Sequence, residues 1–331
     1  MALATLERPH SPVPNHENPP AHLPKSQTLP DAEATRVMIR RDQQKQPSLW
    51  TDLWELTKPE ISFVVAISAA VGYMLGSPAG FNWLGLLHTL IGVSLSSAGG
   101  AVLNHYIERD LDAKMHRTAR RPLPAERLKP LPVLIMGLSM CVLGVSYVWL
   151  MLNPLTTYLS AATIVLYVGI YTPLKRMTKY NTLVGTIPGA LPALGGYTAA
   201  TGEVGEAGLI LFGILVCWQM PHFLALAWMY RKDYERGGFK MLPVMEPDGR
   251  STGIQTVLYT ALLVGLSLTL MFTGQVGGLY LSGAIVLGSY FLTMSLRFYY
   301  DHSHHSARKV LLTSVMYIPA LLLCIVLDRF V

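Results

Sequence analysis

The chain has 331 residues, of which 51% are hydrophobic and only 14% are charged, whereas a typical soluble domain has about 25% charged residues. This composition excludes a globally disordered chain, a scaffold held by disulfides and an ordinary cytosolic enzyme. The formal net charge is +6, but the 47 residues from Ile61 up to Glu108 contain no Asp, Glu, Lys or Arg. Because about 20 apolar residues span a bilayer, the sequence predicts an all-α, polytopic membrane protein.

Residues 1–48 differ in composition from the rest of the chain. They contain eight prolines and mixed charges but few large apolar residues, so they cannot bury enough surface to offset the entropy of ordering. We expect a disordered cytoplasmic tail over residues 1–48 and one membrane domain over residues 49–331. A short amphipathic stretch from Leu49 to Thr57 leads into Lys58-Pro59, which opens the first apolar run.

Nine apolar segments follow, and each is long enough to be a helical crossing. Their approximate ranges are 60–77, 83–104, 131–150, 155–172, 182–200, 208–228, 254–273, 278–297 and 309–327. Pro188 and Pro192 lie inside the fifth segment, and we expect them to kink or break that helix.

The basic residues indicate the orientation of these helices. The N-terminal tail and every second connection hold 25 of the 26 Lys and Arg residues, and only Arg329 lies beyond them. Under the positive-inside rule, the N-terminus and the long polar loops face the cytoplasm and the C-terminus lies outside.

Three oxygen-bearing side chains follow one another at helical spacing near the end of the second segment. Asn104, Glu108 and Asp112 are each four residues apart, so a continuous helix places them on one face. Oxygen ligands at a membrane edge suit Mg²⁺, which takes one or two carboxylates and completes its shell with water and substrate phosphate. The other interpretation is a solvated helix end whose carboxylates pair locally with Arg109, Lys114 or Arg117. Asp110 points elsewhere on either interpretation and is expected to be solvated or paired with an arginine.

Two further cytoplasmic loops carry basic and aromatic residues. The first includes Tyr171, Lys175 and Arg176, and the second follows Trp218, Gln219 and His222. Acidic oxygens for a cation and basic groups for an anion would then lie beside an apolar bundle, a combination that fits a phosphorylated lipid. The plainer interpretation is that most of these basic residues are the positive-inside signal or contact anionic headgroups.

Several polar residues allow two interpretations each. Gln219 and His222 lie within an apolar helix, where ionisable groups mark functional sites by default, but a core histidine bonded to a neighbouring helix is an alternative. His302, His304 and His305 have no companion cysteine, and we expect them to be solvated surface residues.

The motifs as a whole resemble a known family. The string from Asn104 to Asp112, continued by Arg117 and by Arg121-Pro122, is similar to the first motif of the UbiA superfamily of intramembrane prenyltransferases. The form that this motif takes in the present chain resembles that of the heme O synthase (protoheme IX farnesyltransferase) subfamily. The strings Trp-Gln-Met-Pro-His at 218–222 and Met-Leu-Pro at 241–243 are similar to the same subfamily. The similarity covers about residues 50–330, and the tail matches nothing.

The resemblance implies a bundle of nine transmembrane helices around a central cavity that opens to the cytoplasmic side. It also implies a reaction in which heme B, farnesyl diphosphate and water give heme O and diphosphate. It implies a heme A synthase as a downstream partner and no nucleic-acid partner. The tail is too acidic for an organelle transit peptide, and this favours a bacterial inner membrane over a mitochondrial one as the location.

The resemblance also implies roles for individual residues. Asn104, Glu108 and Asp112 would bind Mg²⁺ and diphosphate, while Lys175 and Arg176, with Arg117 and Arg121 as further candidates, would neutralise diphosphate oxygens. In the mechanism that this reaction requires, the rings of Trp218, Phe223 and Tyr171 would stabilise an allylic cation. Gln219 is a further candidate for substrate binding, and His222 would contact the heme, as an iron ligand or as a partner of a propionate. Asp233 belongs to the second motif of the family and is expected to contribute to catalysis and to metal binding.

The sequence departs from the superfamily at two places. Position 108 is Glu where the superfamily has Asp, and Asp233 is followed four residues later by Gly237 where a second Asp is usual. Without the second Asp, a second Mg²⁺ would be held less firmly. Candidates to replace part of its charge are Tyr230, Arg231 and Lys232. The alternatives are another prenyltransferase of this superfamily, acting on a quinone precursor or chlorophyllide, and, in a different class, a membrane transporter.

Overall fold

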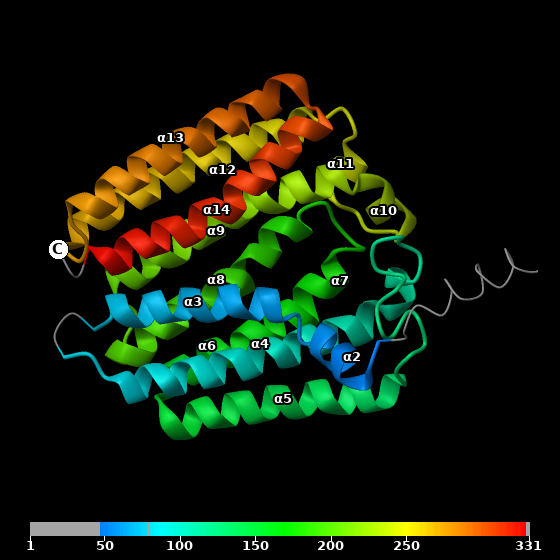
Figure 1. Ribbon diagram of the computed structural model, residues 1–331, viewed down its shortest axis with the longest axis horizontal. Coiled ribbons are helices and arrows are strands. Elements are labelled where there is room, and N and C mark those ends of the chain that lie inside the picture. The colour runs from blue at the N-terminus through cyan, green and yellow to red at the C-terminus, as the bar shows by residue number, and fades with distance from the viewer. Residues whose placement is uncertain (1–46, 78–79, 329–331) are drawn as a thin grey trace, which may run out of the picture. The chain divides into compact units, whose positions relative to one another are not determined.

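A computed structural model describes residues 47–77 and 80–328, and these residues form helices joined by short connections, without any strand (Figure 1). The predicted disordered tail lies outside the described residues. The helices are α2 (Leu49–Leu56), α3 (Pro59–Leu75), α4 (Trp83–Asp112), α5 (Pro130–Met151), α6 (Pro154–Ile164), η1 (Val165–Tyr171), α7 (Thr172–Leu174), α8 (Asn181–Thr201), α9 (Glu206–Met229), α10 (Arg231–Arg236), α11 (Leu242–Met245), α12 (Arg250–Thr269), η2 (Leu270–Thr273), α13 (Gly278–Asp301) and α14 (His304–Leu327).

The prediction of a polytopic all-α membrane protein is confirmed, although the number of nine spans is not. Every predicted segment coincides with helix, and the fourth is made of α6, η1 and α7 in succession. Within the described residues, seven helical stretches are long and apolar enough to cross a membrane, or eight if α2 and α3, bent by 44°, form one span. The fifth predicted segment, α8, is not in this set.

The prolines of α8 do not break it. The helix runs from Asn181 to Thr201 through both Pro188 and Pro192, so of the expected kink or break, the break is wrong. A proline leaves a carbonyl without its helical partner, and neighbouring groups can compensate for this loss inside a bundle. Side chains from neighbouring regions also bind other carbonyls of α8 and connect it to its surroundings: Gln219 Nε2 donates to Thr186 O at 3.1 Å, and Asn153 Nδ2 donates to Thr198 O at 2.8 Å.

Small residues allow the helices around the cavity to approach closely. A Cβ added to Gly72 of α3 would lie 2.0 Å from Ala193 O, and one added to Gly196 of α8 would lie 1.9 Å from Ala69 O. Only glycine fits at either position, since the obstacle is backbone rather than a flexible side chain. The resulting contact between α3 and α8 follows the use of small residues at helix interfaces in membranes.

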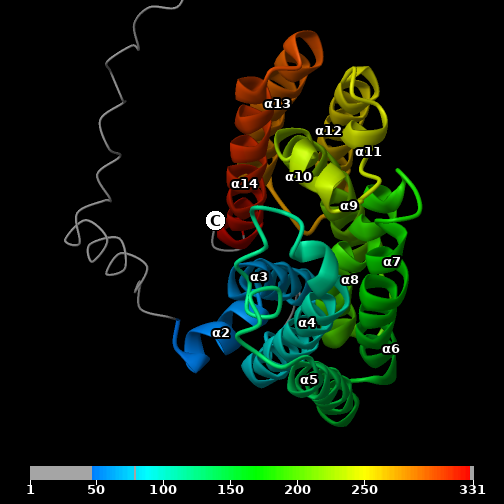
Figure 2. The same cartoon turned by 90° about the vertical axis from the view of Figure 1, so that its right-hand side faces the viewer.

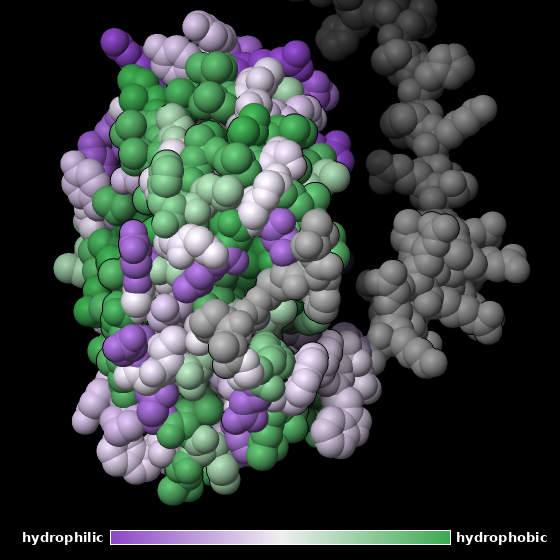
Figure 3. All heavy atoms as spheres, turned by 90° about the vertical axis from the view of Figure 1, so that its left-hand side faces the viewer, coloured by the Kyte–Doolittle hydropathy of each residue, from purple (hydrophilic) through white to green (hydrophobic). Residues whose placement is uncertain are grey.

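The connections gather at the two ends of the bundle. In Figure 1, α2, α7, α10 and α11 lie at the end of the bundle opposite the last turn of α14, and Figure 2 looks onto this end. Figure 3 looks onto the other end, where hydrophobic residues cover much of the visible face and polar residues are scattered among them. The buried hydrophobic core runs mainly between α8, α9, α12, α13 and α14, and includes the fully buried Tyr280, Phe291 and Tyr317.

The short helix α2 is fixed to the polar loop after α4 by a buried ion pair. Arg127 Nη2 lies 2.8 Å from Asp52 Oδ1, and Arg127 Nε donates to both oxygens of the same carboxylate at 3.0 Å. Only 3% of Asp52 is exposed. This contact holds α2, and with it the start of α3 at Lys58, against the end of α4.

Candidate active site

A large cavity lies inside the bundle. Its volume is about 950 Å³, at the upper end of the range usual for ligand pockets. Side chains from α3, α4, α6, η1, α8, α9 and α14 contribute to its lining, and most of its wall is apolar, including Leu159, Leu215, Phe223 and Ile318. A long apolar ligand with a polar head matches this lining, provided that the polar residues gather at one place.

The three oxygen-bearing residues of α4 provide that polar region. α4 continues to Asp112, so Asn104, Glu108 and Asp112 lie along one helix face, as the spacing predicts. All three line the cavity, and their exposed fractions are 1%, 5% and 1%. Buried carboxylates require compensation, because an unpaired charge in such a site is costly.

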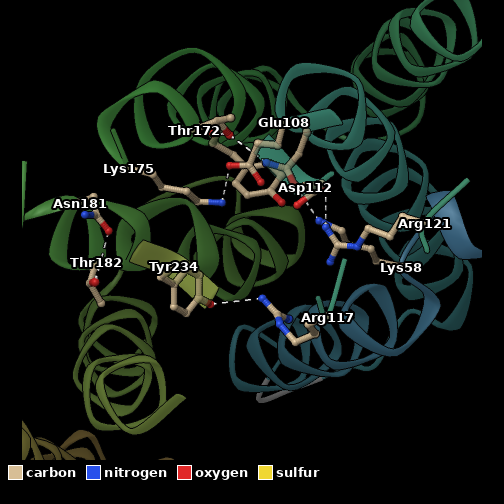
Figure 4. A network of polar contacts seen from close by, with 12 residues as sticks. Lys58, Glu108, Asp112, Arg117, Arg121, Thr172, Lys175, Asn181, Thr182 and Tyr234 are labelled. Atoms are coloured by element: carbon tan, nitrogen blue, oxygen red, sulfur yellow. Dashed lines mark hydrogen bonds and ion pairs between the residues drawn. The ribbon is translucent and has the colours of Figure 1, made fainter. Parts of the chain in front are cut away.

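Each of the three is paired with a basic side chain from another part of the chain, and Figure 4 shows Glu108 and Asp112 with their partners. Lys175 Nζ lies 2.7 Å from Glu108 Oε1, and Arg121 Nη1 lies 2.7 Å from Asp112 Oδ2. Lys58 Nζ donates to Asn104 Oδ1, also at 2.7 Å. The polar mouth, defined as these three residues of α4 with Lys58, Arg121 and Lys175, therefore carries both signs of charge within hydrogen-bonding distance.

The local ion pairs that the sequence allowed are not formed by these carboxylates. Glu108 and Asp112 pair with Lys175 and Arg121 rather than with Arg109, Lys114 or Arg117. Arg109 instead lies 3.6 Å from Asp110, whose side chain is 81% exposed. The expectation that Asp110 points away and pairs with an arginine is thus confirmed.

Lys175 follows α7 and lies against aromatic rings. Its Nζ is 4.7 Å from the centre of the Tyr171 ring and 5.8 Å from that of Phe239. Burial lowers the pKa of Lys175, but the Glu108 carboxylate together with Tyr171 and Tyr167 outweighs burial and raises this pKa above its ordinary value. The side chain therefore remains a cation at neutral pH.

Arg117 connects the cavity to the second predicted motif. Its backbone N donates to Asp233 Oδ2 at 3.3 Å, and its guanidinium donates to the Tyr234 hydroxyl at 3.4 Å. Arg117 and Tyr234 line the cavity, whereas Asp233 does not and also pairs with Arg236 at 3.2 Å. Asp233 is therefore one contact away from the cavity surface, and its metal-binding role stays a prediction.

Four other predicted substrate-binding residues also lie outside the cavity lining. Arg176 and Lys232 are exposed, Tyr230 is 37% exposed and faces the Arg117 guanidinium, and Arg231 stacks over the Trp228 ring at 4.5 Å. The structure brings none of these four to the polar mouth. Their predicted contact with substrate has no support from the geometry.

The predicted residues of α9 do line the cavity. Trp218, Gln219 and His222 contribute to its wall, as does Tyr171 from η1. Gln219 is 5% exposed, and its amide nitrogen donates to the Thr186 and Leu215 carbonyls. This bonding gives Gln219 a structural function in the packing of α9 against α8.

The expectation that all three histidines after α13 are solvated is only partly correct. His304 and His305 are exposed, but His302 is half-buried beside Trp228, Phe298 and Tyr299. Its left-handed backbone, with φ of 47°, ends α13 and turns the ring toward these aromatic residues.

Two cavity residues were not singled out by the sequence. Lys58 precedes a proline and has a φ of 46°, and its bond to Asn104 spans 46 positions. Its one sequence signal is its position: it is a lone lysine at the start of an apolar run, on the predicted side that holds every other Lys and Arg residue except Arg329. His105 lines the cavity at 1% exposure, with both ring nitrogens buried and without a hydrogen-bond partner.

The donor set of the polar mouth fits Mg²⁺ bound together with a phosphate group. Asn104, Glu108 and Asp112 offer oxygen only, which a hard divalent cation prefers, and they face a cavity with room for the remaining ligands. Within the described residues, no three His, Cys, Asp or Glu side chains gather closely enough to hold a metal ion alone. A ligand that brings its own oxygens is therefore needed to complete the shell.

Known proteins resemble this chain in both sequence and fold. Residues 65–318 match the UbiA prenyltransferase family. A protein of Salinibacter ruber named protoheme IX farnesyltransferase is 50% identical over 84% of this chain and 99% of its own length. A protein of the same name from Solibacter usitatus is 44% identical over 84% of this chain and 98% of its own.

Solved structures share the fold at low sequence identity. A structure of digeranylgeranylglyceryl phosphate synthase aligns with a TM-score of 0.71 at 17% identity, over 84% of this chain and 97% of that one. A UbiA homologue from Aeropyrum pernix aligns with a TM-score of 0.67 at 17% identity. A UbiA homologue from Archaeoglobus fulgidus, bound to DMAPP and Mg²⁺, aligns with a TM-score of 0.60 at 14% identity. They cover 81% and 83% of this chain and 98% and 99% of their own. With its sequence match, its all-helical fold and its several apolar helices, this chain is a multi-pass membrane protein and belongs to the UbiA prenyltransferase family.

Proposed function

We propose that this protein is a protoheme IX farnesyltransferase. It transfers the farnesyl group of farnesyl diphosphate to a vinyl group of heme B, with addition of water, and releases diphosphate. The observation that carries the proposal is the polar mouth, where buried oxygen ligands and three basic side chains adjoin an apolar cavity of about 950 Å³. The names of the relatives at 50% and 44% identity supply the acceptor.

The oxygen ligands of α4 hold the metal in this proposal. Asn104, Glu108 and Asp112 bind Mg²⁺ together with the diphosphate. Asp233 accepts a hydrogen bond from the backbone N of Arg117, a residue of the cavity lining, and lies one contact away from this site. A homologue of the same fold is bound to Mg²⁺ and to a prenyl diphosphate, which supports this assignment. Bound Mg²⁺ supplies Lewis-acid stabilisation of the charge that develops on the leaving diphosphate.

The cations of the polar mouth neutralise the diphosphate oxygens. Lys58, Lys175 and Arg121 each contact a residue of the metal set, so an incoming anion finds three donors already at its binding position. Preorganised donors cost no reorganisation when the leaving group acquires charge, and they act strongly in a site that excludes water. Arg117 adds a fourth positive group at the rim of the same cavity.

The apolar part of the cavity holds the farnesyl chain and the heme. Loss of diphosphate leaves an allylic cation, and water must be kept from it until the vinyl carbon reacts. Tyr171, Trp218 and Phe223 line this part, and the ring faces of such residues stabilise a nearby cation by about 0.5–2 kcal/mol each. The same walls favour the flat, apolar macrocycle of heme.

The location follows from the charge pattern and from the relatives. We place the protein in a bacterial inner membrane, with the polar mouth and the N-terminus on the cytoplasmic side and the C-terminus outside, because 25 of the 26 Lys and Arg residues lie on one side of the predicted topology. The product heme O would pass to an enzyme that oxidises it further, such as a heme A synthase.

A competition between acceptors tests the proposal. Purified protein in detergent receives farnesyl diphosphate and Mg²⁺ with equal amounts of heme B, 4-hydroxybenzoate and chlorophyllide, and the prenylated products are separated by mass. We expect farnesylated, hydrated heme only. Prenylation of 4-hydroxybenzoate or chlorophyllide in place of heme would assign the protein to another activity of the family.

A further inference from the structure

The imidazole of His222 is held in one orientation by α14. His222 and Trp218 lie one turn apart on α9, with ring centres 5.4 Å apart, and both bond to Ser314. Trp218 Nε1 donates to Ser314 O at 2.7 Å, and His222 Nδ1 lies 2.8 Å from Ser314 Oγ. The Phe223 ring packs edge-on against the imidazole at a centre distance of 5.4 Å.

The bonds of Ser314 determine which ring nitrogen of His222 carries the proton. Ser314 Oγ lies 2.6 Å from Leu311 O, a distance at which the hydroxyl must donate its single hydrogen to the carbonyl. Ser314 Oγ can then only accept from His222, so Nδ1 carries the hydrogen. In the neutral ring, Nε2 is left with a free lone pair.

This lone pair is available to a ligand in the cavity. His222 lines the cavity, and its Nε2 has no hydrogen-bond partner within residues 47–77 and 80–328. Unlike both ring nitrogens of His105, this atom is not sealed from solvent by neighbouring atoms. The surrounding wall is apolar and includes Leu215, Val315 and Pro319.

The chemistry of this nitrogen selects its ligand. A lone pair cannot donate a hydrogen bond to a carboxylate, so His222 is unsuited to bind a heme propionate, whereas it is suited to a Lewis acid. A free metal ion would need several protein ligands, and no such group exists in the described part of the chain. Heme iron has four porphyrin nitrogens already and needs only one axial ligand from the protein.

We propose that His222 ligates the iron of bound heme through Nε2, with Ser314 as the hydrogen-bond partner that fixes its tautomer. Histidines that bind metals usually donate their other ring N–H to a fixed acceptor, which is the arrangement found at Ser314. The inference rests on heme being the acceptor substrate. Iron ligation then fixes the macrocycle in the cavity, so that a vinyl group can be held toward the polar mouth.

Heme titration of purified variants tests the ligation without relying on turnover. Heme is added to the wild type and to His222→Ala, and the Soret band and heme affinity are measured in detergent. We expect a histidine-ligated spectrum for the wild type. The alanine variant should lose that spectrum and bind heme at least tenfold more weakly, and added imidazole should restore the spectrum. Unchanged Mg²⁺-dependent binding of farnesyl diphosphate serves as the check that the variant is folded.

Further variants make the result specific. His222→Met should give a spectrum with a sulfur ligand, and Ser314→Ala should keep histidine ligation but lower the iron–histidine stretching frequency in ferrous heme. His105→Ala is the matched control, because it removes another histidine of the cavity, and it should retain the histidine-ligated spectrum. A wild-type spectrum and affinity in His222→Ala would overturn the ligation while leaving the proposed function intact. A wild type that neither binds nor farnesylates heme would overturn both.

Discussion

Lys175 and Glu108 form a buried ion pair across the mouth of the cavity, with Nζ 2.7 Å from Oε1 and 67 positions between them in the chain. The lysine comes from the loop after α7 and the glutamate from α4. The pair therefore connects two helical regions at the place where a diphosphate would bind.

Removal of Lys175 is expected to reduce stability as well as activity. Lys175→Met leaves Glu108 buried without a partner, which costs about 3–5 kcal/mol for such pairs. The double variant Glu108→Gln with Lys175→Met leaves no uncompensated charge, so it should recover most of the stability while remaining inactive. Thermal unfolding in detergent compares the stability of the two variants with that of the wild type, and release of diphosphate measures their activity. Equal stability of the single variant and the wild type would show that the pair does not stabilise the fold.

Replacement of Asp112 should remove activity without unfolding the protein. Asp112→Asn keeps the shape of the side chain but removes the charge that faces the metal and Arg121, so we expect kcat to fall at least about 100-fold. Asp110→Asn is the matched control because Asp110 is 81% exposed and points away from the site. If both variants keep wild-type turnover, Asp112 is not part of the metal site.

Lys58 is expected to contribute to the binding of the diphosphate. A hydrogen bond to a charged group contributes about 1.5–3 kcal/mol, which corresponds to about a 10- to 100-fold loss in kcat/KM for farnesyl diphosphate in Lys58→Met. Lys114→Met provides the control, since Lys114 is exposed and belongs to the polar loop that follows α4. A variant at position 58 with the kinetics of the control would exclude Lys58 from the site.

The ion pair between Asp52 and Arg127 is expected to stabilise the entrance rather than take part in the chemistry. Asp52→Ala leaves Arg127 without its main partner and should lower the free energy of unfolding by about 3–5 kcal/mol. Glu55→Ala removes the more exposed partner, 3.7 Å from the same arginine, and should cost at most about 1 kcal/mol. Similar losses in the two variants would contradict this account of how α2 is held.

The local pattern of the sequence predicted much of the fold. Apolar runs and charge-poor stretches located every long helix, and the four-residue spacing placed Asn104, Glu108 and Asp112 on one face because α4 continues without interruption. The continuity of α8 was not predictable, since a proline inside a membrane helix is compatible both with a break and with a helix that runs on, as this one does through Pro188 and Pro192.

The basic partners of Asn104, Glu108 and Asp112 were harder to predict from the sequence than the helix face that these three residues share. Local spacing favoured arginines and a lysine close to Glu108 and Asp112, whereas the structure supplies Lys175 from a distant loop and Arg121 from beyond the end of α4. Lys58 was overlooked because its proximity to Asn104 arises only from the packing of α3 against α4. Such contacts depend on tertiary structure, which residue periodicity does not encode.

Binding of Mn²⁺, followed by its EPR signal, tests most directly whether the polar mouth holds a cation together with diphosphate. Mn²⁺ replaces Mg²⁺ and is titrated into the wild type and Asp112→Asn, with and without a non-hydrolysable farnesyl diphosphate analogue. We expect that the wild type binds Mn²⁺ only together with the analogue, and that the variant loses this binding. Equal, analogue-dependent binding of Mn²⁺ by both proteins would contradict this expectation.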